Sequence, residues 1–297
     1  MTLPNFIVIG AAKAGTTALY HYLAEHPQVF MSAVKETNFF AFGLDAYGRP
    51  LCGGPDASRF GVRSLAEYEA LFAEAGGAVA IGEASPIYLE CPSAAGRIHD
   101  LLPAVRILCS IRHPVDRAYS DYQMYLRSEG QGLDPARDLD PAAAWARPDS
   151  HWMQIGHYHE QLARYFDLFS REQIQVSLFD DLQRSPAKVT QEVYRFVGVD
   201  PSFAPDFETP HAPGGLPVSR VLESLLTSKA LQSVVKPWIP SGAANWIKRA
   251  RRRNLQPAPR LPAKLRNELT SQFRDDIART SALIGRSLDH WLQPARD

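Results

Sequence analysis

Residues 6–17 read Phe6-Ile7-Val8-Ile9-Gly10-Ala11-Ala12-Lys13-Ala14-Gly15-Thr16-Thr17. The first four residues are apolar and strand-forming, and the glycine that follows them is typical of the end of a buried parallel strand. Thr16 or Thr17 can cap a helix that begins directly afterwards, and Pro27 marks the end of that helix. The stretch therefore predicts a strand, a glycine-containing loop and a helix, which is the repeating unit of α/β domains.

The rest of the chain repeats this alternation of strand and helix patterns. Short apolar strand candidates occur at residues 29–31, 79–81, 107–111 and 174–179. Helical spacing of apolar residues occurs at 65–75 and 115–127. The pattern predicts an α/β fold of three layers, in which helices flank a mainly parallel central sheet. With 297 residues, 45% of them hydrophobic, the chain can form one domain over residues 1–297.

Two segments interrupt the regular pattern and are expected to be loop excursions. Residues 130–150 are rich in Asp, Pro and Ala, and residues 200–217 contain five prolines. Long surface loops of this kind either close over a binding site or are tolerated insertions, and the composition fits both. We expect the C-terminal part, residues 218–297, to be helical, with Gly285 just past the end of a helix.

Charge and cysteine content limit the classes of protein that fit. Lys and Arg together number 32, as do Asp and Glu, so we expect no nucleic-acid partner. Three cysteines without a CxxC pair argue against a disulfide framework and against a thiolate metal site. The first residues lack a basic or long apolar leader. These features predict a cytoplasmic protein in a reducing compartment.

The loop between the first strand and helix has the properties of an anion site. Backbone N–H groups and the dipole of a helix N-terminus favour a phosphate, and small residues let the backbone approach it. Lys13 adds a movable positive charge. The usual P-loop pattern places Lys directly after its second Gly, whereas Thr16 follows Gly15 here. The match to kinases and NTPases is therefore broken.

With its Lys shifted in this way, the loop resembles the 5′-phosphosulfate loop of sulfotransferases that use 3′-phosphoadenosine 5′-phosphosulfate (PAPS). The resemblance implies a P-loop-like fold and PAPS as the sulfuryl donor, with no metal. It implies that Lys13 holds the oxygen bridging phosphate and sulfate, and that Thr16 and Thr17 bind the 5′-phosphate. The backbone of Ala14 and Gly15 completes the same loop.

A second motif lies at residues 107–122, where an apolar strand leads to Arg112 and Pro114 opens a helix that carries Ser120. A guanidinium and a hydroxyl can together bind one phosphate. The segment resembles the 3′-phosphate element of the same family, which implies that role for Arg112 and Ser120. Arg220 is an additional candidate contact if loop 200–217 closes over the nucleotide. Alternatively, Arg112 only pairs with Asp116.

Two further segments resemble the acceptor side of the heparan-sulfate branch of these enzymes and its bacterial relatives. The segment Lys35-Glu36-Thr37-Asn38-Phe39-Phe40 implies Glu36 as general base and Lys35 as a charge that assists transfer. We expect neighbouring phenylalanines to bury Glu36. The segment Gly82-Glu83-Ala84-Ser85-Pro86-Ile87-Tyr88 resembles another element of that branch, but the branch usually has Lys where this chain has Ala84. The branch also often has His where this chain has Asn38. These departures argue against a heparan-like acceptor. The candidate acceptor contacts are Asn38, Phe39, Ser85 and Tyr88.

Structural alternatives to these roles remain open. Lys35 and Glu36 can form an exposed ion pair, and Tyr88 can pack in the core. Asp180, after strand candidate 174–179, resembles the metal-holding Asp of P-loop NTPases, which would make the protein an ATP-dependent small-molecule kinase. Residues 246–253 combine Trp and Ile with five basic residues, a pattern that fits a membrane surface, an acidic acceptor or a solvated helix face.

The sequence as a whole favours a PAPS-dependent sulfotransferase that acts on a hydroxyl or amine of a small molecule, glycan or lipid-linked metabolite. The kinase is one alternative. A non-catalytic protein that keeps the nucleotide fold and docks through residues 246–253 is the other.

Overall fold

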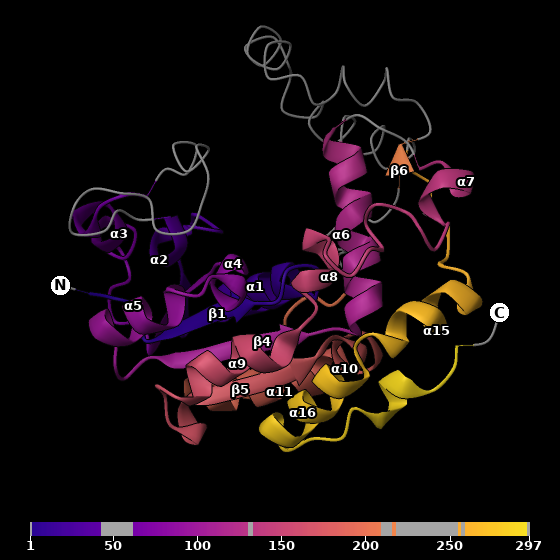
Figure 1. Cartoon of the computed structure of the whole chain (residues 1–297). Helices are drawn as coiled ribbons and strands as arrows, with labels where there is room; N and C mark the ends of the chain where they lie inside the picture. Colours follow the sequence, from indigo (N-terminus) through magenta and orange to yellow (C-terminus); the bar gives the residue numbers. More distant parts are fainter. Residues whose placement is uncertain are drawn as a thin grey trace, which may run out of the picture.

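A computed structural model describes residues 2–42, 62–129, 133–208, 216–217, 255–256 and 259–295 of the chain. Its centre is a five-stranded sheet with the order β2-β3-β1-β4-β5, in which every neighbouring pair is parallel (Figure 1). The strands are β1 (Phe6–Gly10), β2 (Val29–Met31), β3 (Ala80–Ala84), β4 (Arg106–Ile111) and β5 (Ile174–Leu178). Two short strands, β6 (Leu216–Pro217) and β7 (Leu255–Gln256), pair antiparallel elsewhere. The predicted parallel α/β sheet is confirmed.

Helices connect the strands and continue beyond the last one. The first half contains α1 (Thr16–Glu25), α2 (Phe39–Phe42), α3 (Leu65–Ala70), α4 (Ile87–Glu90), α5 (Ala94–Leu101) and α6 (Pro114–Ser128). Then follow α7 (Pro135–Asp138), α8 (His151–Gln154), α9 (Tyr158–Phe166), the 3-10 turn η2 (Arg171–Gln173), α10 (Phe179–Arg184) and α11 (Pro186–Val197). The C-terminal elements are α15 (Ala263–Ser271), α16 (Arg274–Ile284) and the 3-10 turn η4 (Asp289–Leu292).

The two faces of the sheet pack against different helices, because side chains alternate along each strand. Val8 of β1 belongs to one apolar cluster with Leu19 of α1 and with residues of α11. Its neighbour Ile7 belongs to a second cluster with Ile98 of α5 and Leu162 of α9. The sheet is therefore the middle of three layers, as the sequence predicted.

The segment 130–150 differs from the expected surface loop. Its described part, residues 133–150, contains α7 and buries Trp145, whose side chain is fully enclosed. The indole Nε1 of Trp145 donates a 2.8 Å hydrogen bond to the backbone oxygen of Asp138. The Asp138 carboxylate in turn accepts a hydrogen bond from the hydroxyl of Tyr122 on α6. Weak periodicity concealed this anchoring, since single buried residues hold the segment without a regular amphipathic pattern.

The C-terminal part is helical where it is described. Gly285 ends α16 with φ of 65°, a left-handed conformation that glycine adopts readily, as predicted. Arg220 and residues 246–253 lie outside the described residues. Division of the chain into one domain with loop excursions stays a prediction.

The cysteine prediction is wrong in one respect. Cys91, which follows α4, is disulfide-bonded, whereas Cys109 of β4 is a free, buried thiol. Sequence spacing showed no paired motif, because a disulfide requires proximity in space, which distant cysteines acquire only on folding. A helix that is both long and apolar enough to cross a membrane does not occur among the described residues.

Candidate active site

The β1–α1 loop leads directly into the first turn of α1. Gly15 precedes the helix with φ of 87°, and a Cβ at this position would lie 2.6 Å from Cδ2 of Leu182. Only glycine fits both the backbone conformation and the space. The helix has no side-chain cap, so the N–H groups of its first turn are available to an external acceptor. Thr16, which is buried, and Thr17 form this turn, and their role in binding an anion stays a prediction.

Lys13 reaches across from the loop to helix α6. Its Nζ lies 3.3 Å from the Sδ of Met124. Burial lowers the pKa of Lys13, Asp121 opposes this, and the nearby cations Arg127, Arg112 and Arg117 lower the pKa further. Positive charges therefore outnumber negative ones around the loop, and an anionic ligand would offset their repulsion.

Arg112 joins the two sequence motifs physically. It follows β4 and donates from Nη1 to the backbone oxygen of Lys13 at 3.2 Å. Its guanidinium also lies over the Phe179 ring, 4.7 Å from the centroid. The strand before it supports the same loop, because Oγ of Ser110 donates to the Ala14 oxygen at 2.7 Å. Two segments about a hundred residues apart are thus joined at the carboxyl end of the sheet, where parallel α/β folds bind ligands.

Among the described residues, no hydrogen bond or close ion pair joins Arg112 to Asp116, although the two charges interact electrostatically. The Asp116 carboxylate instead accepts two hydrogen bonds from Arg266 of α15, from Nε at 2.8 Å and from Nη2 at 3.0 Å. Ser120 lies on α6, partly exposed, one turn before the Met124 that contacts Lys13. Within the described part of the chain, no hydrogen bond joins Ser120 to Arg112, so their joint role remains a proposal.

Glu36 follows β2 in the chain and lies in a strained turn that contacts the end of β3. Its φ is 64°, in the left-handed region, and its N–H donates to the Ala84 oxygen at 2.9 Å. The carboxylate pairs with Lys35 Nζ at 2.5 Å, and 51% of the Glu36 side chain is exposed. The expected burial of Glu36 by its phenylalanine neighbours is therefore wrong. Those rings pack into the core, where Phe39 stacks on Tyr68 at 4.5 Å.

A buried carboxylate that sequence reasoning missed lies behind this turn. Glu83 of β3 is fully buried and accepts hydrogen bonds from four hydroxyls: Thr37 at 2.7 Å, Ser85 at 2.7 Å, Tyr68 at 2.8 Å and Tyr88 at 2.9 Å. Burial raises the pKa of Glu83, while the four hydroxyls lower it. The available signal was an acidic residue inside a buried strand pattern, which requires partners of this kind.

This network corrects the predicted acceptor contacts. Ser85 and Tyr88 are fully buried with their hydroxyls directed to Glu83, so they serve the core rather than a substrate. Phe39 is buried in the aromatic cluster as well. The side chain of Asn38 is also buried, and its φ of 55° continues the strained turn that begins at Glu36. A strand end followed by Pro86 resembled a binding loop, but its side chains point inward.

Asp180 forms hydrogen bonds to the C-terminal part of the chain. Its Oδ2 accepts hydrogen bonds from the indole of Trp291 at 2.8 Å and from the ring of His290 at 3.1 Å, both in η4. These bonds attach the C-terminal turn to α10 through one oxygen of the carboxylate that the kinase alternative requires. Groups of three or more His, Cys, Asp or Glu side chains arranged to hold a metal ion do not occur in the described ranges.

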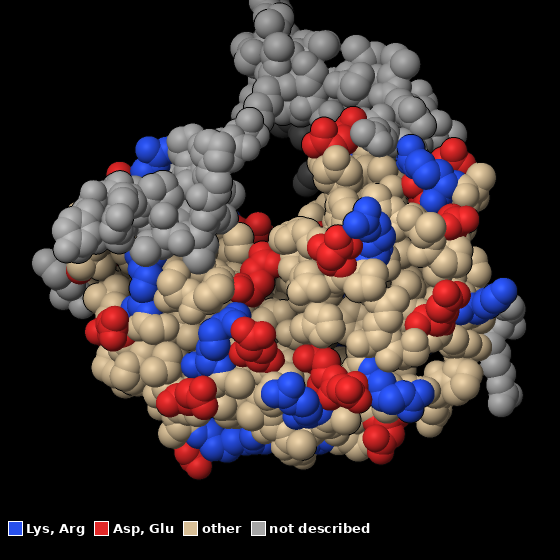
Figure 2. Space-filling view, in the orientation of Figure 1, with Lys and Arg blue, Asp and Glu red and all other residues tan. Residues whose placement is uncertain are grey.

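The surface above these residues is hollowed. Figure 2 shows a depression between the side that carries α4 and the side that carries α6 and α8, with acidic side chains at its edge. One cavity in this region, of about 420 Å³, is lined by residues of α4, α8 and α9.

Comparison with known proteins agrees with the geometry. Residues 4–204 match the group described as "Sulfotransferase family". A solved structure, a sulfotransferase from Alicyclobacillus acidocaldarius, is 30% identical, covers 99% of this chain and 100% of its own, and has a TM-score of 0.69.

Two mouse proteins among the curated relatives are similar over part of their length. The bifunctional heparan sulfate N-deacetylase/N-sulfotransferase 4 is 30% identical, with 68% of this chain covered and 23% of that protein. The heparan sulfate glucosamine 3-O-sulfotransferase 6 is 28% identical, with 66% of this chain and 52% of that protein covered. The chain thus spans about a quarter of the first of these and about half of the second. On the family match and the full-length structural likeness, this chain belongs to the sulfotransferase family.

Proposed function

We propose that the protein transfers a sulfuryl group from PAPS to a hydroxyl or amine of a small molecule or glycan. The observation that carries this proposal is the hydrogen bond from Arg112 to the Lys13 oxygen, which brings both anion-binding elements together. PAPS carries a 5′-phosphosulfate and a separate 3′-phosphate, so it requires two such elements side by side.

The residues fit this donor. The uncapped first turn of α1, with Thr16 and Thr17, would hold the 5′-phosphate. Arg112, with Ser120 on the helix α6 that follows it, would hold the 3′-phosphate. Lys13, surrounded by other cations, gains most from a bound anion and would lie at the oxygen that bridges phosphate and sulfate. Bound PAPS would supply an activated sulfuryl group with a phosphate leaving group.

In the transfer step, the acceptor oxygen or nitrogen forms a bond to sulfur while the bond from sulfur to the bridging oxygen breaks. Lys13 stabilises the negative charge that develops on that oxygen. Glu36 takes the proton that the acceptor loses, and its exposed position keeps it accessible. Lys35, paired with Glu36, would offset negative charge on the transferring group. The proton ends on Glu36, and the electron pair ends on the departing phosphate.

The names of the two mouse relatives specify transfer to nitrogen in one case and to oxygen in the other, so we propose both acceptor classes for this chain. The proposed cytoplasmic location rests on sequence alone, and the disulfide at Cys91 weighs against a reducing compartment. Contact of residues 246–253 with a membrane or acidic acceptor also stays a proposal.

The experiment is a direct comparison of nucleotides and products. Calorimetry should show tight binding of 3′,5′-bisphosphoadenosine and weak binding of ATP with Mg²⁺. Incubation with PAPS and an acceptor panel should give products heavier by one sulfuryl group, detected by mass spectrometry. Preferential ATP binding with transfer of phosphate would establish the kinase instead.

A further inference from the structure

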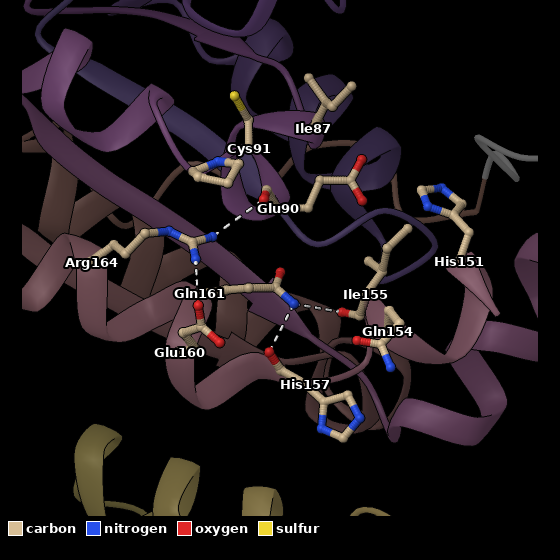
Figure 3. A pocket seen from close by; sticks show the side chains of 11 residues that line it. Ile87, Glu90, Cys91, His151, Gln154, Ile155, His157, Glu160, Gln161 and Arg164 are labelled. Carbon is tan, nitrogen blue, oxygen red and sulfur yellow. Dashed lines mark hydrogen bonds and ion pairs between the residues drawn. The ribbon is translucent and has the colours of Figure 1, made fainter. Parts of the chain in front are cut away.

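The cavity between α4, α8 and α9 has unmet hydrogen-bonding capacity. Its volume is about 420 Å³, and Figure 3 shows polar side chains from all three helices around it. Apolar walls come from Ile87, Pro92 and Ile155. The polar lining comprises Glu90, His151, Gln154, His157, Glu160, Gln161 and Arg164.

Gln161 provides the first unmet group. Only 7% of this residue is exposed, and its Nε2 donates to the Ile155 oxygen at 2.9 Å and the His157 oxygen at 2.8 Å. These two bonds fix the amide orientation, so that Oε1 faces Glu90 across the cavity (Figure 3). The buried Oε1 atom has no hydrogen-bond partner among the described residues. A buried carbonyl oxygen of this kind requires a donor.

Glu90 provides the second group that lacks a hydrogen-bond partner. It ends α4, and its carboxylate points into the cavity (Figure 3). In the part of the chain that is described, no ion pair or hydrogen bond engages this carboxylate. Burial raises the pKa of Glu90 to about 7, Arg117 lowers it, and Asp121 raises it. The charged form of Glu90 therefore lacks a close counter-ion.

The cationic side chain in the lining is already engaged. Arg164 donates from Nη2 to the backbone oxygens of Leu89 at 3.0 Å and Glu90 at 3.2 Å, and its Nη1 lies 3.7 Å from Glu160. The guanidinium therefore does not neutralise the Glu90 side chain. Two acceptors in the lining, Oε1 of Gln161 and the carboxylate of Glu90, thus lack a partner among the described residues, as does one buried donor, Nε of Arg164.

The cavity adjoins the donor site through α6. Glu90 and Lys13 both interact electrostatically with Arg117 and Asp121, which pair with each other at 3.3 Å. The hydroxyl of Tyr158, from the cavity helix α9, donates to the Arg112 oxygen at 2.8 Å. Helix α9 thus lines the cavity and also contacts the backbone of Arg112.

We propose that this cavity binds a protonated amine of an aliphatic amino alcohol or amino sugar, with Glu90 as counter-charge and Gln161 Oε1 as second acceptor. That this ligand is the sulfuryl acceptor rests on the proposed function, whereas binding of the amine does not. The aliphatic walls of Ile87, Pro92 and Ile155 would contact the carbon frame of this ligand.

The test is calorimetric titration with trans-4-aminocyclohexanol and with the neutral trans-1,4-cyclohexanediol. The amine should bind measurably and the diol about 10–100-fold more weakly, the range typical for loss of a charge-assisted hydrogen bond. Glu90→Gln should weaken amine binding by the same factor and leave diol binding unchanged. Glu192→Gln, an exposed glutamate on α11, is the matched control and should bind like the parent.

Amine affinity should also rise with pH as Glu90 ionises, and the rise should vanish in Glu90→Gln. The other charged or titratable groups that face Glu90 are Arg117 and Asp121 of α6, His151 of α8, and His157, Glu160 and Arg164 near or on α9. A pH-dependent rise that survives in Glu90→Gln would assign it to the histidines and overturn the role of Glu90.

Binding of 3′,5′-bisphosphoadenosine to the same samples separates the two proposals. Nucleotide binding without amine discrimination would overturn the cavity assignment and leave the proposed function intact. Amine binding that depends on Glu90, without nucleotide binding, would support the cavity assignment and overturn the proposed function.

Discussion

The hydroxyl of Thr37 donates a 2.7 Å hydrogen bond to Oε2 of Glu83, a carboxylate that is completely enclosed by the core. Thr37 directly follows the exposed Glu36, whose N–H is bonded to the Ala84 oxygen. The backbone of the proposed base is thus held by the end of β3, and its neighbour Thr37 is held by the buried carboxyl group of Glu83. A surface carboxylate positioned in this way loses less freedom when an acceptor arrives.

Glu83→Gln tests the role of this network in stability. The amide offers one acceptor oxygen where the carboxylate offers two, so some of the four hydroxyls lose their partner. Each unsatisfied buried hydroxyl costs about 1–3 kcal/mol. Urea unfolding should show a lower free energy of unfolding, with Glu192→Gln unaffected. Unchanged stability of Glu83→Gln would mean that the hydroxyls find other partners.

Glu90→Gln should change the pH dependence of stability. The pKa of Glu90 is about 7 in the folded protein and about 4.5 ordinarily, so the folded state retains a proton that the unfolded state loses between these values. The contribution of Glu90 to stability therefore falls as pH rises through this window. The variant should gain stability relative to the parent at about pH 8 and show no such gain at about pH 4. Urea titrations at both pH values measure this, and an equal difference at each would contradict it.

The sequence predicted the parallel sheet and the donor loop because both depend on local patterns. Strand 6–10, its glycine turn and the helix after it are specified by consecutive residues. The positions of Ser85 and Tyr88 could not be predicted in this way, because their direction depends on Glu83, whose four partners come from three different segments of the chain. The cavity at Glu90 was also missed, since its residues lie on three helices that meet only after folding.

Arg112→Ala should weaken binding of 3′,5′-bisphosphoadenosine more than binding of 5′-AMP. Loss of a charge-assisted phosphate contact costs roughly 1.5–3 kcal/mol, or about one to two decades in affinity. The bond to the Lys13 oxygen is lost as well, so 5′-AMP binding should fall slightly. Calorimetry with both nucleotides provides the measurement. Equal losses for both would place Arg112 away from the 3′-phosphate.

Glu36→Gln should lower the turnover number by on the order of 10²–10⁴ and leave nucleotide affinity near the parental value. The amide keeps the size of the side chain but cannot accept the proton. An acceptor with an acidic hydroxyl, such as a phenol, should be affected less than an aliphatic alcohol. If Glu36 serves only as an exposed partner of Lys35, its loss costs about 0–1 kcal/mol of stability and turnover stays normal.

The rate of sulfuryl transfer from PAPS by the parent and by Lys13→Ala tests the proposed chemistry most directly. Lys13 contributes little to the core, so the variant should fold and show the parental far-ultraviolet circular dichroism. Its transfer rate, followed by mass spectrometry of the sulfated acceptor, should be lower by on the order of 10²–10³, as expected when one charge-stabilising donor is removed. A folded Lys13→Ala protein that transfers the sulfuryl group at the parental rate would contradict the assignment of this loop.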